Sequence, residues 1–390
     1  MRVLNLAQPS APVTLEVVHS TATELLMSVL AVGDLLGLNK AVETYDMGRE
    51  GLERLQSRAS KELLADIERL FGGPTTLGET CGKFLSNLFG FVLDAAPQRD
   101  VPAFLDRLEA SDPSEVLLAL VGYHTRHHRV APPDIARRAV AGDAEAREVF
   151  LTGARDRWGE KDGLVKGLAH VLELGPGAVH AGLVDSLRRW DAEVFAQYQD
   201  EALPVLERDF KAKLKMAEEH SLERTIELAT NGIQFTPEIG VNRVVLTPTY
   251  ILRPWVLITE YKDIGIYIYP VSDESLEVDE SVPPPQLVKL YKALGDANRL
   301  RLLQRLAKGP MVLKEATELL GSAKSTAYHH LAILRQAGLV WVREDEDHTY
   351  TLRDDLIPQA SELLQGYLRI KPLAQEPRIA RIGSVADGRI

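Results

Sequence analysis

The clearest hydrophobic pattern in the chain lies within residues 322–339. Its apolar positions stand at i, i+4 and i+7, on one side of a helix: Ala327, Leu331 and Leu334. Ser322 is suited to cap the start of this helix, and Gly338 stands just past its end, where a left-handed residue closes a helix at little cost. The pattern therefore predicts a helix between these residues, followed by a strand over Val340–Glu344.

The neighbouring segments predict further elements in a recognisable order. Asp296 is suited to cap an earlier helix, whose inward positions are expected to be Leu300, Leu303 and Leu306. Gly309-Pro310 ends that helix, and a second helix follows over Val312–Leu320. After the third helix, Val340–Glu344 and His348–Leu352 alternate like two strands of a hairpin. Three helices followed by a hairpin form the winged variety of helix-turn-helix.

Polar side chains lie off the apolar stripe of the third helix, which favours a DNA-recognition helix. They are hydrogen-bond donors, or donors and acceptors, of the kind that reach phosphates and base edges. The predicted DNA-binding residues, including one on the wing, are Lys324, Ser325, Thr326, Tyr328, His329, Arg335 and Arg343. His330 falls between apolar positions and is expected to pack. Arg299 and Arg301 either contact the DNA backbone or solvate a helix face.

Two stretches carry a resemblance to a known family. Leu294-Gly-Asp-Ala-Asn-Arg-Leu-Arg-Leu-Leu and Ser325-Thr-Ala-Tyr-His-His-Leu-Ala-Ile-Leu-Arg-Gln-Ala-Gly-Leu-Val resemble motifs of the ArsR/SmtB winged-helix repressors, over roughly residues 285–370. The resemblance implies a homodimer on double-stranded DNA, with a dimer interface formed by the helices Pro285–Leu294 and Leu356–Tyr367. A dimer of this kind implies an operator that is an imperfect palindrome.

The chain departs from that family at two places. Many members sense metal through cysteines before the turn, but Met311-Val-Leu-Lys-Glu-Ala contains none. Thiolate metal sensing is therefore not expected, and no metal or cofactor is predicted. The wing tip Glu344-Asp-Glu-Asp347 is acidic and repels phosphate, so only Arg343 or Arg353 is expected to contact DNA from the wing.

The rest of the chain predicts a mainly α-helical domain with a small antiparallel β-sheet. Long helical patterns cover Gly177–Gln199 and Pro204–Ala229. The segments expected as strands are Val13–His19, Arg243–Thr247, Trp255–Tyr261 and Gly265–Tyr269. The predicted organisation is a helical domain over 1–271, a linker over 272–285, the winged helix over 286–370 and a loose tail over 371–390.

Charge is distributed unevenly between these parts. The chain has a net charge of -11, but residues 285–370 hold 12 Lys and Arg against 10 Asp and Glu, a net +2. The first 284 residues carry 29 basic against 44 acidic residues, so the acidity belongs to the other domain. A net +2 predicts modest DNA affinity per subunit, steep loss of binding with salt, and dependence on dimerisation.

Cysteine and hydropathy patterns favour a cytoplasmic location. Cys81 is alone, so no disulfide forms within one chain and a reducing compartment fits. The longest apolar stretch, near Leu25–Leu38, contains Asp34 and is too short to span a membrane. The N-terminus lacks the apolar core of a signal peptide.

Other candidate chemistry is weak in this sequence. His124 and His128 are spaced i, i+4 as on a metal-binding helix, but Arg126 and Arg129 crowd them with positive charge. An aromatic set suits either core or the lining of an apolar ligand pocket: Trp190, Phe195, Tyr198, Phe210, Trp255, Tyr261, Tyr267 and Tyr269. No nucleophile, metal or nucleotide motif was found, so the chain is not expected to be an enzyme.

Together these patterns predict a DNA-binding transcriptional regulator, modulated through its N-terminal domain by a small molecule or a protein. Two alternatives remain at this point. In the first, the N-terminal domain is an enzyme, and the winged helix tethers it or mediates protein contacts. In the second, the N-terminal domain is architectural and sets the spacing of the dimer.

Overall fold

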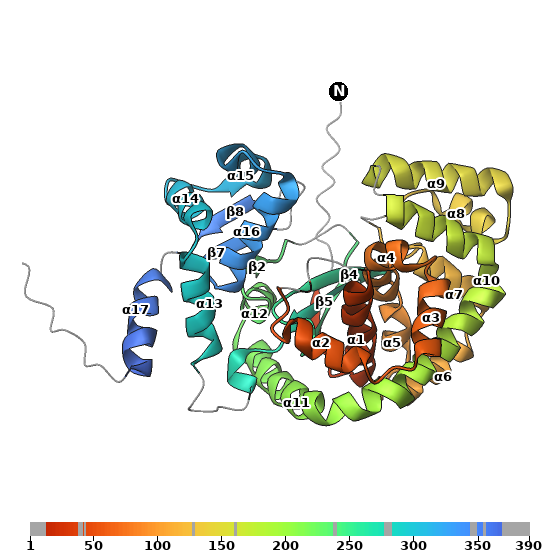
Figure 1. The fold of residues 1–390 in the computed structure, drawn as a ribbon, viewed down its shortest axis with the longest axis horizontal. Coiled ribbons are helices and arrows are strands. Elements are labelled where there is room, and N and C mark those ends of the chain that lie inside the picture. Colours follow the sequence, from red (N-terminus) through yellow and green to blue (C-terminus); the bar gives the residue numbers. More distant parts are fainter. Residues whose placement is uncertain are drawn as a thin grey trace, which may run out of the picture.

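The computed structural model describes residues 13–37, 42, 44–126, 129–159, 162–236, 240–276, 283–343, 349–353 and 356–368. This part of the chain is mainly α-helical, with a large N-terminal domain and a C-terminal winged helix beside it (Figure 1). The expected tail over 371–390 and the acidic wing tip over 344–347 lie outside the described residues. Among those that are described, no helix has the length and apolar character needed to cross a bilayer.

The centre of the N-terminal domain is helix α1 (Thr21–Leu36), which is buried at every position from Ala22 to Leu35. Ser20 caps it by accepting a hydrogen bond from Thr23 N at 3.2 Å, because its extended backbone turns the hydroxyl toward the first turn. The shorter helices around it are α2 (Gly48–Gln56), α3 (Lys61–Leu70), α4 (Pro74–Ser86), α5 (Phe89–Asp94), α6 (Val101–Glu109), α7 (Pro113–Leu120), α8 (Pro133–Val140) and α9 (Ala144–Trp158). Helix α4 approaches α1 closely at Gly33, where an added Cβ would lie 2.7 Å from Cys81 Sγ.

A long helical arc runs along one edge of the domain (Figure 1). It consists of α10 (Asp162–Trp190), the π-helical turn η2 (Asp191–Phe195) and α11 (Ala196–Glu219), and α12 (Leu222–Ala229) follows. The sequence predicted a break before Pro204, but α11 continues through it and ends at Glu219 instead. Buried residues on both sides of the proline, Ala202 and Val205 among them, hold the helix in place.

The sheet of the N-terminal domain is mixed, with the strand order β1-β3-β5-β4. Its strands are β1 (Thr14–Val17), β3 (Arg243–Thr249), β4 (Leu257–Tyr261) and β5 (Ile264–Pro270). β1 pairs in parallel with β3, β3 in parallel with β5, and only β4 with β5 is antiparallel. The expectation of an antiparallel sheet was therefore wrong for two of these three pairs. The long crossovers that join the parallel strands leave no turn motif in the sequence.

The winged helix follows the predicted order of elements. Its elements are α13 (Pro285–Leu294), α14 (Ala297–Leu306), β6 (Met311–Val312), α15 (Leu313–Leu320), α16 (Lys324–Gln336), β7 (Val340–Arg343), β8 (Thr349–Leu352) and α17 (Leu356–Tyr367). Asp296 caps α14 as expected, accepting from Arg299 N at 3.0 Å. Leu300 was expected inward but is 49% exposed, because Leu302 takes the core position on this helix.

The two domains share a sheet, and backbone hydrogen bonds join them. Strand β2 (Ile233–Gln234) of the N-terminal domain pairs in parallel with β7, giving the order β2-β7-β8-β6. Val342 N donates to Gly232 O at 2.9 Å beside this pairing. The start of the expected linker is also packed, because Ser272 N and Ser275 Oγ both donate to the buried carboxylate of Asp209. The winged helix is thus docked against the N-terminal domain.

Candidate nucleic-acid interface

The helix-turn-helix is formed by α15, a short turn and α16. Gly321 ends α15 in the left-handed conformation, with φ 61°, which suits a residue without a Cβ. The chain then reverses through Ser322 and Ala323 into α16. The turn is held by Ser322 N, which donates to Thr317 O at 3.3 Å.

Helix α16 has one buried side and one polar side, as its pattern predicted. Ala327, Leu331 and Leu334 are all fully buried in the core of the winged helix. Five of the predicted DNA-binding residues are exposed on the other side: Lys324, Ser325, Thr326, Tyr328 and His329. Burial of the stripe sets the rotation of the helix about its axis, so these side chains are presented together.

The start of α16 differs from the expectation. Ala323, and not Ser322, occupies the cap position, and no side chain accepts a hydrogen bond from the first turn. The Ser322 hydroxyl instead lies 3.5 Å from Ala323 O. The first turn therefore has backbone N–H groups that no side chain caps, a feature that favours anions at helix N-termini.

Arg335 does not belong to the polar side. It is only 8% exposed, and its Nη1 donates to Thr230 O in the N-terminal domain at 2.8 Å. The guanidinium is occupied at the domain junction, so the structure does not bring Arg335 together with the other predicted DNA-binding residues of α16. Arg343, at the end of β7, is exposed as predicted for a wing contact.

The adjacent histidines of α16 have different surroundings. His330 is 13% exposed and its Nδ1 lies 3.8 Å from Asp296 Oδ1, so it packs against α14 as expected. His329 is exposed, and partial burial together with the positive charges of His330 and Arg299 lowers its pKa below the ordinary value. A neutral imidazole is thereby favoured at neutral pH, and it can both donate and accept a hydrogen bond.

The two arginines of α14 are engaged with the protein backbone. Arg299 donates to Ala293 O at 2.8 Å and to Lys292 O at 2.6 Å, and its side chain is 13% exposed. Arg301 donates to Leu319 O at 2.7 Å while remaining exposed. Of the two, only Arg301 keeps its guanidinium largely at the surface.

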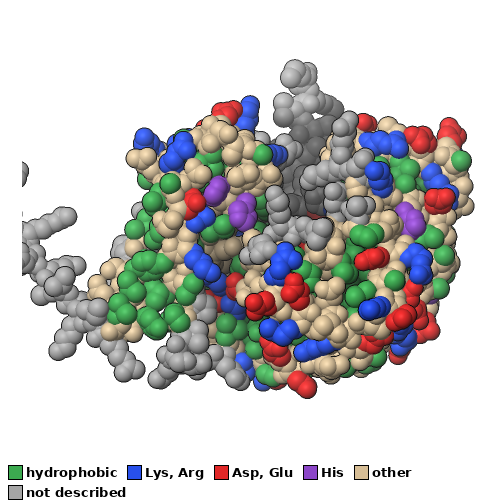
Figure 2. Space-filling view, viewed as in Figure 1, with side chains coloured by type: hydrophobic (Ala, Val, Ile, Leu, Met, Phe, Trp, Pro, Cys, Tyr) green, Lys and Arg blue, Asp and Glu red, His purple; other side chains and the backbone are tan. Residues whose placement is uncertain are grey.

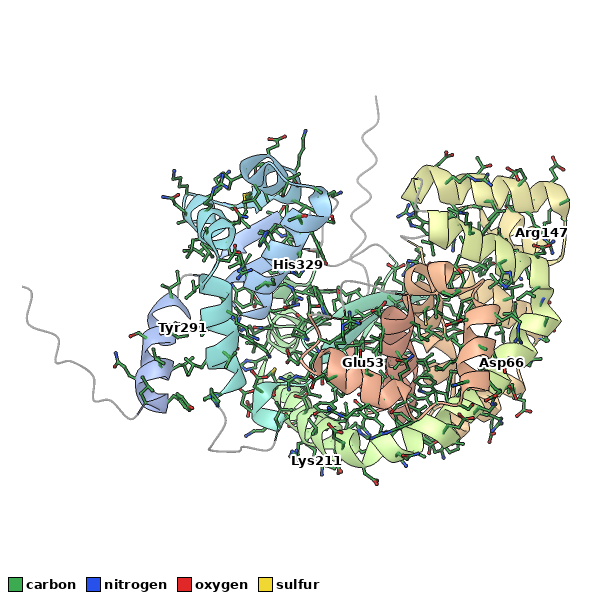
Figure 3. All side chains as sticks on the ribbon, in the orientation of Figure 1. Glu53, Asp66, Arg147, Lys211, Tyr291 and His329 are labelled. Carbon is green, nitrogen blue, oxygen red and sulfur yellow. The ribbon has the colours of Figure 1, made fainter. Side chains whose placement is uncertain are left out.

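Sequence reasoning missed what lies opposite the polar side of α16. Tyr328 and His329 line a cleft whose other wall is formed by α2 and the segment 250–255 of the N-terminal domain. Figure 3 places His329 on the side of α16 that faces that domain. Nothing in the sequence signals this, because it depends on how the winged helix docks.

The two other candidates from the sequence are the pair His124 and His128 and the aromatic set. His124 packs edge-on against Tyr123 and Tyr261, with ring centroids 5.0 and 4.9 Å apart, while His128 lies outside the described residues. Among the residues that are described, no group of three or more His, Cys, Asp or Glu is placed to hold a metal. Of the aromatic set, Trp190, Phe195, Tyr198 and Tyr269 are fully buried, whereas Trp255 is partly buried and lines the cleft.

Comparison with known proteins agrees with this geometry. A family model described as a helix-turn-helix domain matches residues 294–343, which run from the end of α13 to the end of β7. An uncharacterised HTH-type transcriptional regulator of Methanocaldococcus jannaschii is 33% identical over 78 residues. That match covers 20% of this chain and 88% of the relative. No solved structure matched the chain.

These matches fall on the elements that present the polar side of α16, and they cover nearly the whole of the archaeal relative. The chain therefore belongs to the helix-turn-helix transcriptional regulators.

Proposed function

We propose that this protein is a DNA-binding transcriptional regulator of the ArsR type, which binds a palindromic operator as a homodimer. The single observation that carries the proposal is the exposed polar side of α16. Lys324 and Ser325 stand in an uncapped first turn, where backbone N–H groups and a cation favour a phosphate. Tyr328 and His329 follow on the same side and supply donors and acceptors for base edges.

An apolar patch on α13 and α17 supports the homodimer. These helices pack side by side on the outer edge of the winged helix, where apolar side chains gather (Figure 2). The exposed members of the patch are Tyr291, Ile357, Leu363 and Tyr367, each between 38% and 44% exposed. A second copy of the chain related by a two-fold axis would cover the same patch on both subunits.

A sensory role for the N-terminal domain, and not a catalytic one, is also part of the proposal. One of its fully buried carboxylates, that of Glu24, is occupied by four protein donors. They are the hydroxyls of Tyr198 and Thr249 and the backbone N–H groups of Tyr250 and Ile251, at 2.7 to 3.0 Å. A carboxylate held in this way ties α1 to α11 and the end of β3, and has no lone pair left for a substrate.

The test is selection of the purified full-length protein against random duplex DNA, followed by titration of the recovered site at several salt concentrations. His329→Ala should lower discrimination between the operator and random DNA, by about 1–3 kcal/mol for a lost base contact. Lys324→Ala should weaken both about equally and reduce the slope of log affinity against log salt by about 1. Lys211→Ala, an exposed residue on α11 of the N-terminal domain, is the matched control.

Recovery of a palindromic site would support the regulator and its dimer. If a site is recovered but neither α16 variant changes its binding, α16 is not the recognition helix. If no site is enriched at low salt with or without candidate effectors, the alternative of an N-terminal enzyme tethered to a protein-contact module gains weight.

A further inference from the structure

A cleft of about 1460 Å³ separates α16 from the N-terminal domain. One wall is built by α2 and the segment 250–255, and the other by α13 and α16. Figure 2 shows histidine and basic side chains gathered beside this space. Small-molecule sites usually enclose about 300–1,000 Å³, so the cleft has room for an organic ligand of considerable size.

Three cations line the cleft without a carboxylate partner among the described residues. Arg54 lies in the last turn of α2, Arg58 lies two residues past the end of that helix, and Lys292 lines the cleft from α13. The Nη1 atom of Arg58 is shielded from solvent and has no hydrogen-bond partner within the described part of the chain. The helix dipole favours cations at the end of α2, but it does not satisfy a shielded N–H group. An anion in the cleft would supply the missing acceptor.

The other basic groups of the cleft are balanced. Arg253 is 3% exposed and forms ion pairs with Asp46, at 3.1 Å, and with Asp273. Lys289 of α13 reaches the same two carboxylates, at 3.3 and 3.1 Å. These four residues neutralise one another and connect α13 to the N-terminal domain. Arg299 also lines the cleft, but it donates to two backbone carbonyls and lies 3.9 Å from Asp296, while the carboxylate of Glu201 accepts from Tyr250. The cations of the cleft that have no carboxylate partner among the described residues are therefore Arg54, Arg58 and Lys292.

Aromatic rings face the cleft from both walls. On the N-terminal side, Trp255 is held by a hydrogen bond of 2.7 Å from its Nε1 to Thr44 Oγ1, and Tyr250 by one of 3.2 Å to Glu201. Tyr328 and His329 of α16 line the opposite wall. Rings on two walls, with those of the N-terminal wall anchored at their polar ends, provide stacking surfaces for a planar group between them.

We propose that this cleft binds a small molecule that carries both an aromatic ring and a negatively charged group, the chemistry of a nucleotide. The ring lies between the aromatic side chains of the two walls, and the anion pairs with Arg54 and Arg58. Neither half of such a ligand uses the whole cleft, so both are needed for tight binding.

The site has a consequence for DNA binding, and this part of the inference rests on the proposed function. Ser325, Thr326, Tyr328 and His329 line the cleft and are also the proposed DNA contacts. A recognition helix enters the major groove between two sugar–phosphate backbones, whereas α16 here faces α2 and the segment 250–255 across the cleft. A ligand in the cleft and an operator therefore compete for the same side of α16. A ligand that bridges the walls stabilises this closed arrangement, so ligand and operator weaken each other's binding.

Binding of the ligand to the cleft is tested by calorimetry on the full-length protein, without DNA. The probes are ATP, adenosine, which has the ring alone, and inorganic tripolyphosphate, which has the charge alone. The variant is Arg54→Ala/Arg58→Ala. The matched control is Arg69→Ala/Arg155→Ala, which removes two exposed arginines that do not line the cleft. Quenching of Trp255 fluorescence, lost in Trp255→Phe, places the bound probe in the cleft.

We expect ATP to bind at least ~10-fold more tightly than adenosine or tripolyphosphate. The affinity of the Arg54→Ala/Arg58→Ala variant for ATP should be at least ~10-fold lower than that of the wild type, since each charge-assisted hydrogen bond contributes about that factor. The control variant should change the affinity by less than ~2-fold. If ATP does not bind, the titration is repeated with 1-anilinonaphthalene-8-sulfonate, a different anionic aromatic molecule. Failure of both probes to bind in an Arg54- and Arg58-dependent way overturns the proposal. Tighter binding of a ten-residue thymidine oligonucleotide than of ATP would identify a single-strand groove and also overturn it.

The effect of the ligand on DNA binding is tested by measuring operator binding with and without the bound probe. Release of operator by the probe from the wild type, but not from the Arg54/Arg58 variant, is the expected result. Simultaneous binding without mutual weakening overturns the exclusion. If the probe binds as predicted and no DNA is ever bound, the proposed function fails while the ligand site stands. If DNA is bound and no probe is, the ligand site fails and the proposed function stands.

Discussion

The guanidinium of Arg335 donates a hydrogen bond of 2.8 Å to the backbone carbonyl of Thr230, across the junction between the two domains. Next to it, Asn231 Nδ2 donates to Gln336 O at 2.7 Å. The last turn of α16 is thereby attached to the end of α12. These contacts, with the pairing of β2 and β7, determine which way the polar side of α16 faces.

Replacement of Arg335 by methionine should lower the stability of the protein. It should not change the affinity of the folded protein for the operator, because Arg335 makes no DNA contact in this arrangement. The change leaves the Thr230 carbonyl without its buried partner, which costs about 1–3 kcal/mol in the free energy of unfolding. Urea unfolding measures this, and operator titration is run on the same preparation. Arg343→Met, at an exposed position, should stay within about 0.5 kcal/mol of the wild type. Weaker DNA binding by Arg335→Met at unchanged stability would instead assign Arg335 to the DNA interface.

A single charge in the apolar patch should dissociate the proposed homodimer. Leu363 is 38% exposed on α17, and Leu363→Glu would place a carboxylate in both halves of a two-fold interface. Only the exposed part of each leucine is buried by association, so its loss on both subunits amounts to roughly 1–2 kcal/mol, and the buried carboxylates add the larger cost of desolvating two unpaired charges. Sedimentation velocity at micromolar concentration should show a shift from dimer to monomer. Leu214→Glu, at a position 43% exposed on α11, is the control that should remain dimeric. A wild-type chain that sediments as a monomer would contradict the interface.

The fully buried carboxylate of Glu24 is expected to be important for stability. In Glu24→Gln, the amide –NH₂ would face donors that cannot reverse, namely the backbone N–H of Tyr250 or of Ile251. We expect a loss of about 2–4 kcal/mol in the free energy of unfolding, because a charged acceptor is lost and a buried donor is left unpaired. Chemical denaturation measures the change, with Glu53→Gln on the exposed side of α2 as the neutral control (Figure 3). An unchanged midpoint for Glu24→Gln would show that the network contributes little.

Acid should destabilise the domain partly through His124. Burial first, and then the positive charges of Lys262, Arg137 and Arg129, lower the pKa of His124 from 6.5 to about 4. The unfolded chain therefore takes up the proton first, and stability falls as the pH drops from 6.5 toward 4, while above pH 6.5 the group has no effect. For this partly buried side chain we expect about 1–2 kcal/mol after allowance for solvent screening.

The His124→Phe variant keeps the aromatic contacts with Tyr123 and Tyr261 and removes the titrating group. Its unfolding free energy should fall less steeply than that of the wild type between pH 6.5 and 4. Parallel curves for the two proteins across this interval would exclude the contribution of His124.

Local patterns were sufficient where neighbouring residues decide the structure. The bounds of α13 and α17 match Pro285–Leu294 and Leu356–Tyr367, the helices expected together with the family resemblance. The buried stripe of α16 and its exposed polar side followed from spacing alone. The wrong break before Pro204 shows the limit of this reasoning, because long-range packing keeps the helix continuous there.

A winged helix with a polar recognition helix could be predicted from the residues alone, because helical periodicity and turn residues act over a few positions. The parallel pairs of the N-terminal sheet, the burial of Arg335 and the position of α16 opposite α2 became known from the folded structure. Each of these depends on contacts between residues far apart in the chain, such as Arg335 with Thr230. The free energy of such contacts comes from burial and hydrogen bonding between surfaces that form only when both domains are folded.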